Sequence, residues 1–313
     1  MPEPHKSLIG DEIRSALKEG MARLRAAHVP SHTLAAEVLL VDVLGRDRAW
    51  LYTHAEDRID EAASARFFAL IARRAAGEPT QYLTGRQEFW GLEFEVTPAV
   101  LIPRPETEHV VEVALERLGS RAIPIDTTTG ERNPTLQVAD IGTGSGCLAV
   151  ALAHELPHAV VFATDISAAA LEVARRNAAR HDVIDRIHFL QADLLAALLP
   201  ESRSRPGESR RFDLIVSNPP YIAHDDIACL EREVRDHEPE AALCGGGIGV
   251  EIYGRLIEQA ARSLTSKGIF VVELGWGAAA KVEGMLEAEP EWTNIHTTND
   301  LAGVPRVLAA EHL

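Results

Sequence analysis

Residues 10–77 follow the hydrophobic pattern of amphipathic helices. In the first stretch, apolar residues recur at three- and four-residue spacings that place them on one helix face: Ile13, Leu17, Met21 and Leu24. Two further apolar stretches, 31–45 and 60–79, each end at a glycine or a proline, as helices commonly do. We therefore predict a small helical bundle, and nothing in it indicates catalytic chemistry.

Between residues 81 and 105 the pattern changes from helical spacing to alternation. The stretch is rich in aromatic and β-branched residues, and apolar and polar positions alternate around Gly91. Such a pattern is typical of a β-hairpin. Pro103 and Pro105 end it, and helical spacing resumes after them.

From Thr135 onward, apolar strand-like runs alternate with amphipathic helical stretches. Strands of this kind, each followed by a helix, indicate a parallel sheet covered on both faces. We predict an α/β fold with a Rossmann-like, mostly parallel seven-stranded sheet, whose last two strands close the chain. The predicted domains are 1–80 (helical), 81–105 (hairpin linker) and 106–313 (sheet domain). Two polar stretches, 127–134 and 200–211, are predicted surface loops.

The composition is that of a soluble globular protein, with 46% hydrophobic and 25% charged residues. No stretch approaches the twenty apolar residues of a membrane span, and the charged N-terminus lacks the apolar core of a signal peptide. Three separated cysteines indicate neither a disulfide framework nor a zinc site. These features together predict a cytoplasmic protein. The histidine pairs with metal-like spacing are interrupted by prolines, so we predict no metal site.

Charge is unevenly distributed along the chain. Residues 1–85 hold 11 Lys and Arg against 12 Asp and Glu, whereas residues 86–313 hold 20 against 35, a net charge of −15. A protein that grips a nucleic-acid backbone needs an excess of cations. The balance therefore disfavours direct nucleic-acid binding without excluding a small basic groove.

A glycine-rich turn follows the first predicted strand of the sheet domain. It reads Gly142-Thr143-Gly144-Ser145-Gly146, and its glycines would let a ligand approach the backbone closely. A dinucleotide fingerprint would have Gly or Ala where this chain has Cys147, which argues against NAD. A tight turn without a ligand is the alternative.

The next three predicted strands also end in polar residues, where ligands bind in open parallel sheets. Asp165, nineteen residues after Gly146, would accept the hydroxyls of a ribose, or would cap the following helix. Asp193 would accept an exocyclic adenine amine while Leu194 packs on the ring. Asn218 ends the fourth strand, in a turn that would hold a substrate or simply be rigid.

These motifs together resemble the class I AdoMet-dependent methyltransferases, whose "NPPY" signature stands here at Asn218–Tyr221. The segments "GRQEFWGLEFEVTPAVLIPRPETE" and "LGWGAAAKVEGML…DLAGVPRVL" further resemble the protein-(glutamine-N5) methyltransferases of peptide chain release factors. The resemblance covers nearly the whole chain. It implies S-adenosyl-L-methionine (AdoMet) as cofactor, bound at residues 142–146, Asp165, Asp193, Leu194 and Asn218, and a release factor as protein substrate.

The "NPPY" turn suits a planar nitrogen nucleophile. Asn218 and the main-chain carbonyl of Pro219 would accept the two amide N–H groups, which directs the nitrogen lone pair at the methyl group. Pro219 and Pro220 stiffen the turn because each fixes its own φ. Tyr221 offers a flat face on which the amide would pack.

Three alternatives stay open from the sequence: glutamine methylation of a ribosomal protein, amino-methylation of a nucleic-acid base, and a non-catalytic binding module. The same turn would serve adenine N6, cytosine N4 or guanine N2. The charge balance disfavours the nucleic-acid target, and the intact turn disfavours a decayed site. Arg104, Glu106 and Glu108 have no assigned role, and the glycines 245–249 would form either a loop over the entrance or a plain connector.

Overall fold

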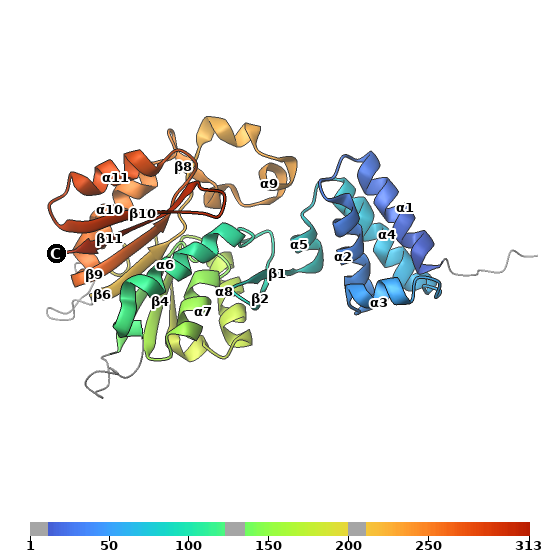
Figure 1. The fold of residues 1–313 in the computed structure, drawn as a ribbon, viewed down its shortest axis with the longest axis horizontal. Helices are drawn as coiled ribbons and strands as arrows, with labels where there is room; N and C mark the ends of the chain where they lie inside the picture. The colour runs from blue at the N-terminus through green and yellow to red at the C-terminus, as the bar shows by residue number, and fades with distance from the viewer. Residues whose placement is uncertain (1–11, 123–134, 200–210) are drawn as a thin grey trace, which may run out of the picture. The chain divides into compact units, whose positions relative to one another are not determined.

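The computed structural model describes residues 12–122, 135–199 and 211–313, which form two compact units (Figure 1). The helical unit comprises the chain up to Gly85 together with residues 231–237, and the sheet unit comprises Arg86–Leu230 and Glu238–Leu313. The predicted domain limits at 80 and 105 stay predictions. The predicted loop 127–134 and all but the last residue of 200–211 lie outside the described residues.

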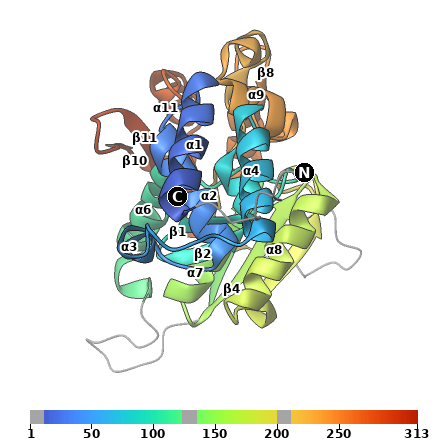
Figure 2. The same cartoon turned by 90° about the vertical axis from the view of Figure 1, so that its right-hand side faces the viewer.

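The helical unit contains the predicted bundle, in which three long helices pack side by side (Figure 2). Its core is apolar and centres on Leu24, Leu39 and Phe67, none of which is exposed. Asp60 caps α4 by accepting the main-chain N–H of Ala63 at 2.8 Å. The helices from the N-terminal part of the chain are α1 (Ile13–Ala26), α2 (His32–Leu44), α3 (Arg48–Thr53), α4 (Glu61–Ala75) and α5 (Thr80–Thr84). The short helices α3 and α5 were not predicted.

A short helix from far along the chain, α9 (Arg232–His237), completes the helical unit. Arg74 on α4 is 5% exposed, and its Nη2 lies 2.5 Å from Oε2 of Glu233. A guanidinium buried to this degree needs a charged partner, and here the partner comes from a segment 159 residues away. The sequence pattern gave no indication of this pairing.

The sheet unit is built on seven strands in the order β10-β11-β9-β6-β3-β4-β5. β11 pairs antiparallel with β10 and β9, and the other four pairings are parallel, so the predicted mostly parallel sheet is confirmed. The strands are β3 (Leu136–Ile141), β4 (Ala159–Asp165), β5 (Ile187–Gln191), β6 (Phe212–Ser217), β9 (Leu264–Glu273), β10 (Trp292–Asn299) and β11 (Pro305–His312).

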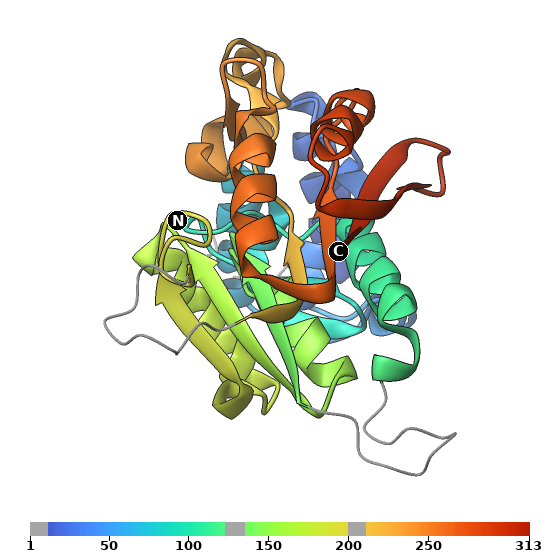
Figure 3. The same cartoon turned by 90° about the vertical axis from the view of Figure 1, so that its left-hand side faces the viewer.

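Helices cover both faces of this sheet, and each face has its own apolar core (Figures 1 and 3). Side chains alternate along each strand, so Val138 faces one core while its neighbour Ala139 faces the other. One face carries α6 (Glu108–Leu118), α7 (Cys147–Glu155) and α8 (Ala168–Arg180), and the other carries α10 (Glu251–Ser263) and α11 (Ala279–Glu287). Among the described residues, no helix combines the length and apolar character that crossing a membrane requires.

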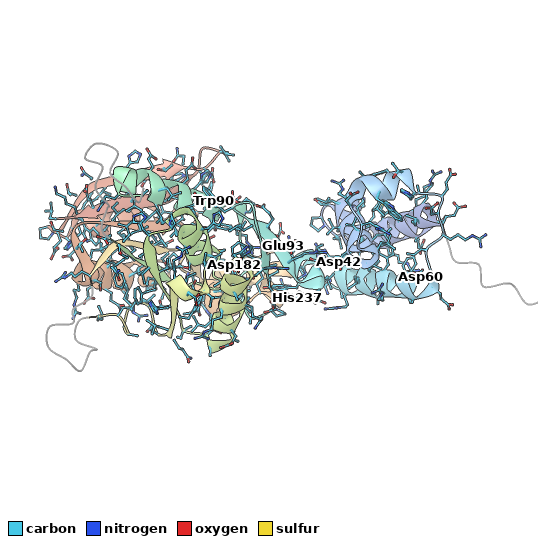
Figure 4. All side chains as sticks on the ribbon, turned by 90° about the horizontal axis from the view of Figure 1, so that it is seen from below. Asp42, Asp60, Trp90, Glu93, Asp182 and His237 are labelled. Atoms are coloured by element: carbon cyan, nitrogen blue, oxygen red, sulfur yellow. The ribbon has the colours of Figure 1, made fainter. Side chains whose placement is uncertain are left out.

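The predicted hairpin is present as β1 (Arg86–Phe89) and β2 (Leu92–Glu95), and it belongs to the sheet unit. Its turn residue Trp90 has a φ of 55°, and the Trp90 indole N–H donates to Glu155 at 3.0 Å. His181, just past the end of α8, contacts the Glu93 carbonyl of β2 through Nε2 at 2.9 Å; Figure 4 labels Glu93 and Asp182, the residue after His181. The buried side chain of Asn177 bonds to both the N–H and the carbonyl of Glu95. The hairpin is thereby fixed on α8.

Candidate active site

The ends of β3 and β6 lie side by side at the point where the chain reverses its direction across the sheet. From β3 the chain adds β4 and β5 on one side, and then returns to place β6 on the other side of β3. Ile141 pairs with Ser217, and the Ser217 hydroxyl donates to the Ile141 carbonyl at 2.7 Å. Gly142 and Asn218 therefore follow directly paired residues, at the switch point where such sheets bind ligands.

The glycine turn after β3 leaves open space beside its first two glycines. Gly142 and Gly144 have φ values of 74° and 54°, and a Cβ at either position would meet no atom within 4 Å. A Cβ at Gly146 would instead lie 3.0 Å from Cβ of Ala174 on α8. The first two glycines thus leave room for a ligand, while the third permits close helix packing. Thr143 and Ser145 between them are buried.

Asp165, at the end of β4, faces the glycine turn. Its Oδ2 accepts the N–H of Gly144 at 2.9 Å, and its Oδ1 accepts the N–H of Ser167 at 2.9 Å. Burial raises the pKa of this carboxyl, and the main-chain donors oppose that shift. Ser167, rather than Asp165, caps α8 through its bond to Ala170. The capping role considered for Asp165 is therefore taken by another residue.

Asp193 and Leu194 follow β5 at the same edge of the sheet. Asp193 is exposed, and its Oδ2 lies 2.5 Å from Nη2 of Arg255 on α10. Leu194 has a φ of 53° and packs against the core under α10 and α11. A ligand that binds to Asp193 would thus share the Asp193 carboxylate with the guanidinium of Arg255.

The four residues of the "NPPY" turn differ in burial. Pro219 is buried, whereas Asn218, Pro220 and Tyr221 are partly exposed. Asn218 Nδ2 donates to the hydroxyl of Thr107 at 3.1 Å. Burial raises the pKa of Tyr221 to about 12, so its phenol stays neutral at physiological pH.

Two glycines from one other segment, residues 244–249, pack closely against this turn. A short strand β8 (Cys244–Gly246) pairs with β7 (Ile222–Ala223), directly after the turn. A Cβ at Gly245 would lie 2.6 Å from the carbonyl oxygen of Pro220, and one at Gly249 would lie 2.5 Å from that of Tyr221. These glycines permit close main-chain packing behind the turn, a role that the sequence did not indicate.

Asp140, the acid before the glycine turn, was missed by the sequence reasoning. It has no solvent exposure, and its Oδ2 accepts the Thr143 hydroxyl at 2.6 Å and the Ala149 N–H at 3.0 Å. Oδ1 has no partner among the described residues, and burial raises the pKa of Asp140 to about 7. The sequence feature that could have identified Asp140 is the presence of an acidic residue in the otherwise apolar end of β3.

The segment before α6 is fixed by a buried carboxylate that follows α9. Glu238 accepts the main-chain N–H of Ile102 at 3.1 Å and lies 2.5 Å from Nη2 of Arg104. Glu108 accepts the N–H of Trp90 at 2.7 Å, whereas Glu106 is exposed. Arg104 and Glu108 thus have structural partners.

The described residues contain no group of three or more His, Cys, Asp and Glu side chains arranged to hold a metal ion. What the site offers is a glycine turn, carboxylates and an amide at adjoining strand ends. This donor set suits a polar organic ligand with hydroxyl and amino groups, such as a nucleoside.

Comparison with known proteins agrees with this geometry. The family description "PrmC N-terminal domain" matches residues 15–85, and "Methyltransferase small domain" matches residues 126–235. The "Release factor glutamine methyltransferase" of Koribacter versatilis is 42% identical over 95% of this chain and 97% of its own. The chain belongs to the release factor glutamine methyltransferases. The relative from Bradyrhizobium diazoefficiens, with the same name, is 40% identical over 100% of this chain and 99% of its own.

Among solved structures, the catalytic domain of hMettl16, in complex with MAT2A 3'UTR hairpin 6, aligns with a TM-score of 0.51. It is 18% identical and covers 77% of this chain and 81% of its own. At this identity the likeness concerns the fold alone. It agrees with the predicted methyltransferase fold of the sheet unit.

Proposed function

We propose that this enzyme transfers a methyl group from AdoMet to the side-chain nitrogen N5 of the glutamine in the Gly-Gly-Gln motif of a peptide chain release factor. The main observation behind this proposal is that Gly142 and Asn218 follow directly paired residues at the ends of β3 and β6. In addition, relatives that match nearly the full length of this chain are named release factor glutamine methyltransferase. A ribosomal-protein or nucleic-acid target has no comparable support among these relatives. A release-factor substrate also agrees with the predicted cytoplasmic location.

The residues of the glycine turn fit AdoMet. The open space beside Gly142 and Gly144 would accept its methionine portion, and the unpartnered Oδ1 of buried Asp140 leaves an acceptor behind the turn. Asp165 would hold the ribose hydroxyls, since each of its oxygens keeps a lone pair beyond its main-chain donor. Asp193 and Leu194 would line the adenine, and the buried Thr143 and Ser145 complete the turn.

AdoMet, when bound, supplies a methyl group already activated by its sulfonium sulfur. The task left to the protein is orientation, which can lower a barrier by about 7–11 kcal/mol in well-aligned systems. Asn218 Oδ1 and the Pro219 carbonyl would each accept one N–H of the glutamine amide. Pro220 keeps the turn stiff, and the neutral Tyr221 would stack on the amide plane.

We assign recognition of the whole release factor to the helical unit. The described part of this unit holds no group placed in the chemistry, and it exposes apolar side chains on α2 and α3, with Leu34 47% and Tyr52 63% exposed. A Leu34→Asp variant should raise KM for a whole release factor. The same variant should methylate a short Gly-Gly-Gln peptide at the wild-type rate. An equal loss on both substrates would contradict this division of labour.

The first experiment is transfer of labelled methyl from AdoMet to purified release factor and, in parallel, to duplex DNA and structured RNA. Two controls accompany it: the Asn218→Ala enzyme, and a release factor whose motif glutamine is changed to alanine. Label on the release factor alone, lost in both controls, is the expected result. Label on a nucleic acid, with the release factor untouched, would overturn the proposal.

A further inference from the structure

A hydroxyl outside the "NPPY" turn connects Asn218 to a buried carboxylate. Thr107 lies at the end of a one-turn helix, Pro105–Thr107, that leads into α6, and its side chain is 2% exposed. Its Oγ1 accepts the Nδ2 proton of Asn218 at 3.1 Å and donates to Oε2 of Glu273 at 2.6 Å. Glu273 ends β9 and is 1% exposed. Three distant segments thus meet in one chain of hydrogen bonds.

The direction of these bonds fixes which way the Asn218 amide points. A threonine hydroxyl has one proton to donate, and an ionised carboxylate only accepts. While Glu273 is ionised, the Thr107 proton is therefore used by Glu273, and Thr107 presents only a lone pair to Asn218. The NH₂ group of Asn218 must face Thr107, which leaves Oδ1 on the other branch of the amide. No described residue donates to that oxygen.

The charge of Glu273 decides whether this arrangement holds. Burial raises its pKa to about 7, while the Thr107 hydroxyl, Arg306 and Arg104 favour the ionised form and Glu106 disfavours it. The phenols of the partly exposed Tyr221 and the buried Tyr253 also lie near this carboxyl. A protonated Glu273 would donate a hydrogen bond to the Thr107 hydroxyl. That hydroxyl would then be able to donate its own hydrogen bond to Asn218. Asn218 would then be favoured with Oδ1 turned toward Thr107.

We propose that Thr107 and Glu273 are positioning residues, which hold the Asn218 amide with Oδ1 available to the N–H of the substrate amide. The inference rests on the proposed function, because it concerns how the same site binds its substrate nitrogen. A flipped Asn218 would present two N–H groups to the substrate's own N–H groups. Substrate and enzyme would then both donate, and the methyl acceptor would lose its orientation.

The test compares variants that differ by one hydroxyl. Thr107→Val keeps the shape and removes the hydroxyl, whereas Thr107→Ser keeps the hydroxyl. Thr265→Val is the matched control: its hydroxyl donates to the Phe212 carbonyl at 3.2 Å, at the opposite end of β9 from Glu273. All variants should bind AdoMet with wild-type affinity in calorimetry and keep their melting temperature within a few degrees.

We expect Thr107→Val to lower kcat on the release factor about tenfold, the size of one lost hydrogen bond. Thr107→Ser and Thr265→Val should stay within about twofold of the wild type, since neither loses the bond to Asn218. A Thr107→Val enzyme with wild-type kcat would overturn the proposal. So would a Thr107→Ser enzyme as slow as Thr107→Val.

A second measurement needs no substrate and so separates this inference from the proposed function. The chain has five asparagines, so the ¹⁵N-labelled side-chain amide of Asn218 can be assigned by its loss in Asn218→Ala. Its protons should exchange slowly in the wild type and in Thr107→Ser, and quickly in Thr107→Val. Slow exchange without any methyl transfer to a release factor would refute only the proposed function. Equal exchange in all variants would refute the positioning chain.

Discussion

A Cβ atom on Gly275 would lie 2.6 Å from Cδ2 of Tyr221, so the tyrosine ring rests directly on the main chain after β9. Gly275 has an ordinary backbone conformation, because it is not among the residues with positive φ. Its lack of a side chain is therefore needed for space alone. The same main chain is held from behind, where the Gly275 N–H donates to the Tyr253 hydroxyl at 3.1 Å.

A Gly275→Ala enzyme should methylate poorly while binding AdoMet normally. The added methyl group must displace the ring of Tyr221, and a misplacement of about 1 Å at a reacting centre can cost about a hundredfold in rate. We expect kcat/KM for the release factor to fall by about tenfold to a hundredfold. Steady-state kinetics and calorimetry with AdoMet measure the two effects.

Gly284→Ala is the matched control for this change. Gly284 lies in α11 with no atom within 4 Å of a Cβ, so alanine there should stabilise the helix by about 0.5–1 kcal/mol and leave the kinetics unchanged. Normal kinetics for Gly275→Ala would show that Tyr221 does not act through its position.

An Asp165→Asn enzyme should bind AdoMet more weakly. Hydrogen bonds to a charged group contribute about 1.5–3 kcal/mol, so the loss of charge should raise Kd by about tenfold to a hundredfold. Asp213→Asn is the control, because its Oδ2 also accepts a main-chain N–H, from Gln137 at 2.9 Å, near the opposite end of the sheet. Equal affinities for both variants would remove Asp165 from the cofactor site.

The kcat of the wild type should fall as the pH drops through about 7. Glu273, with a pKa of about 7, is ionised above that pH and protonated below it, and only the ionised form fixes the Asn218 amide. In a Glu273→Gln enzyme the side chain at position 273 does not titrate, whichever end of its amide faces Thr107. We expect its kcat to lack this acidic limb.

Asp140→Asn serves as the comparison for that pH profile. Asp140 also has a pKa of about 7 but bonds to Thr143 and Ala149 rather than to Thr107. Its variant should keep the acidic limb that Glu273→Gln loses. If Asp140→Asn lost the acidic limb and Glu273→Gln kept it, the pH dependence of kcat would be assigned to Asp140 and the glycine turn instead.

Asp140 and Glu273 should each contribute less to the stability of the protein as the pH rises from about 4 to 7. Both pKa values are raised by burial, so at these two sites the folded state binds more protons than the unfolded state in this window. Stability falls with pH wherever the folded state holds the extra protons, by up to about 1.4 kcal/mol per pH unit for each group. Urea unfolding at several pH values should show a shallower slope for Asp140→Asn. An unchanged slope would contradict the raised pKa.

Local patterns along the chain were enough to predict the bundle, the hairpin and the seven strands. Those features depend on the spacing of apolar residues, and a strand or helix face repeats every two or every three to four residues. The order of polar strand ends was also readable, because parallel strands with crossovers all point their carboxyl ends to one edge. Asp165, Asp193 and Asn218 were found in this way.

Only the tertiary structure decided which distant residues support that edge. Asn218, Thr107 and Glu273 are separated by 111 and 166 residues along the chain, and Arg74 and Glu233 by 159. Nothing in the local spacing of "PETE" or "VVELG" distinguishes a threonine or a glutamate that will be buried beside an asparagine. The need to pair each buried polar group after folding brings these residues together, and that need is set by the packed structure rather than by any one segment.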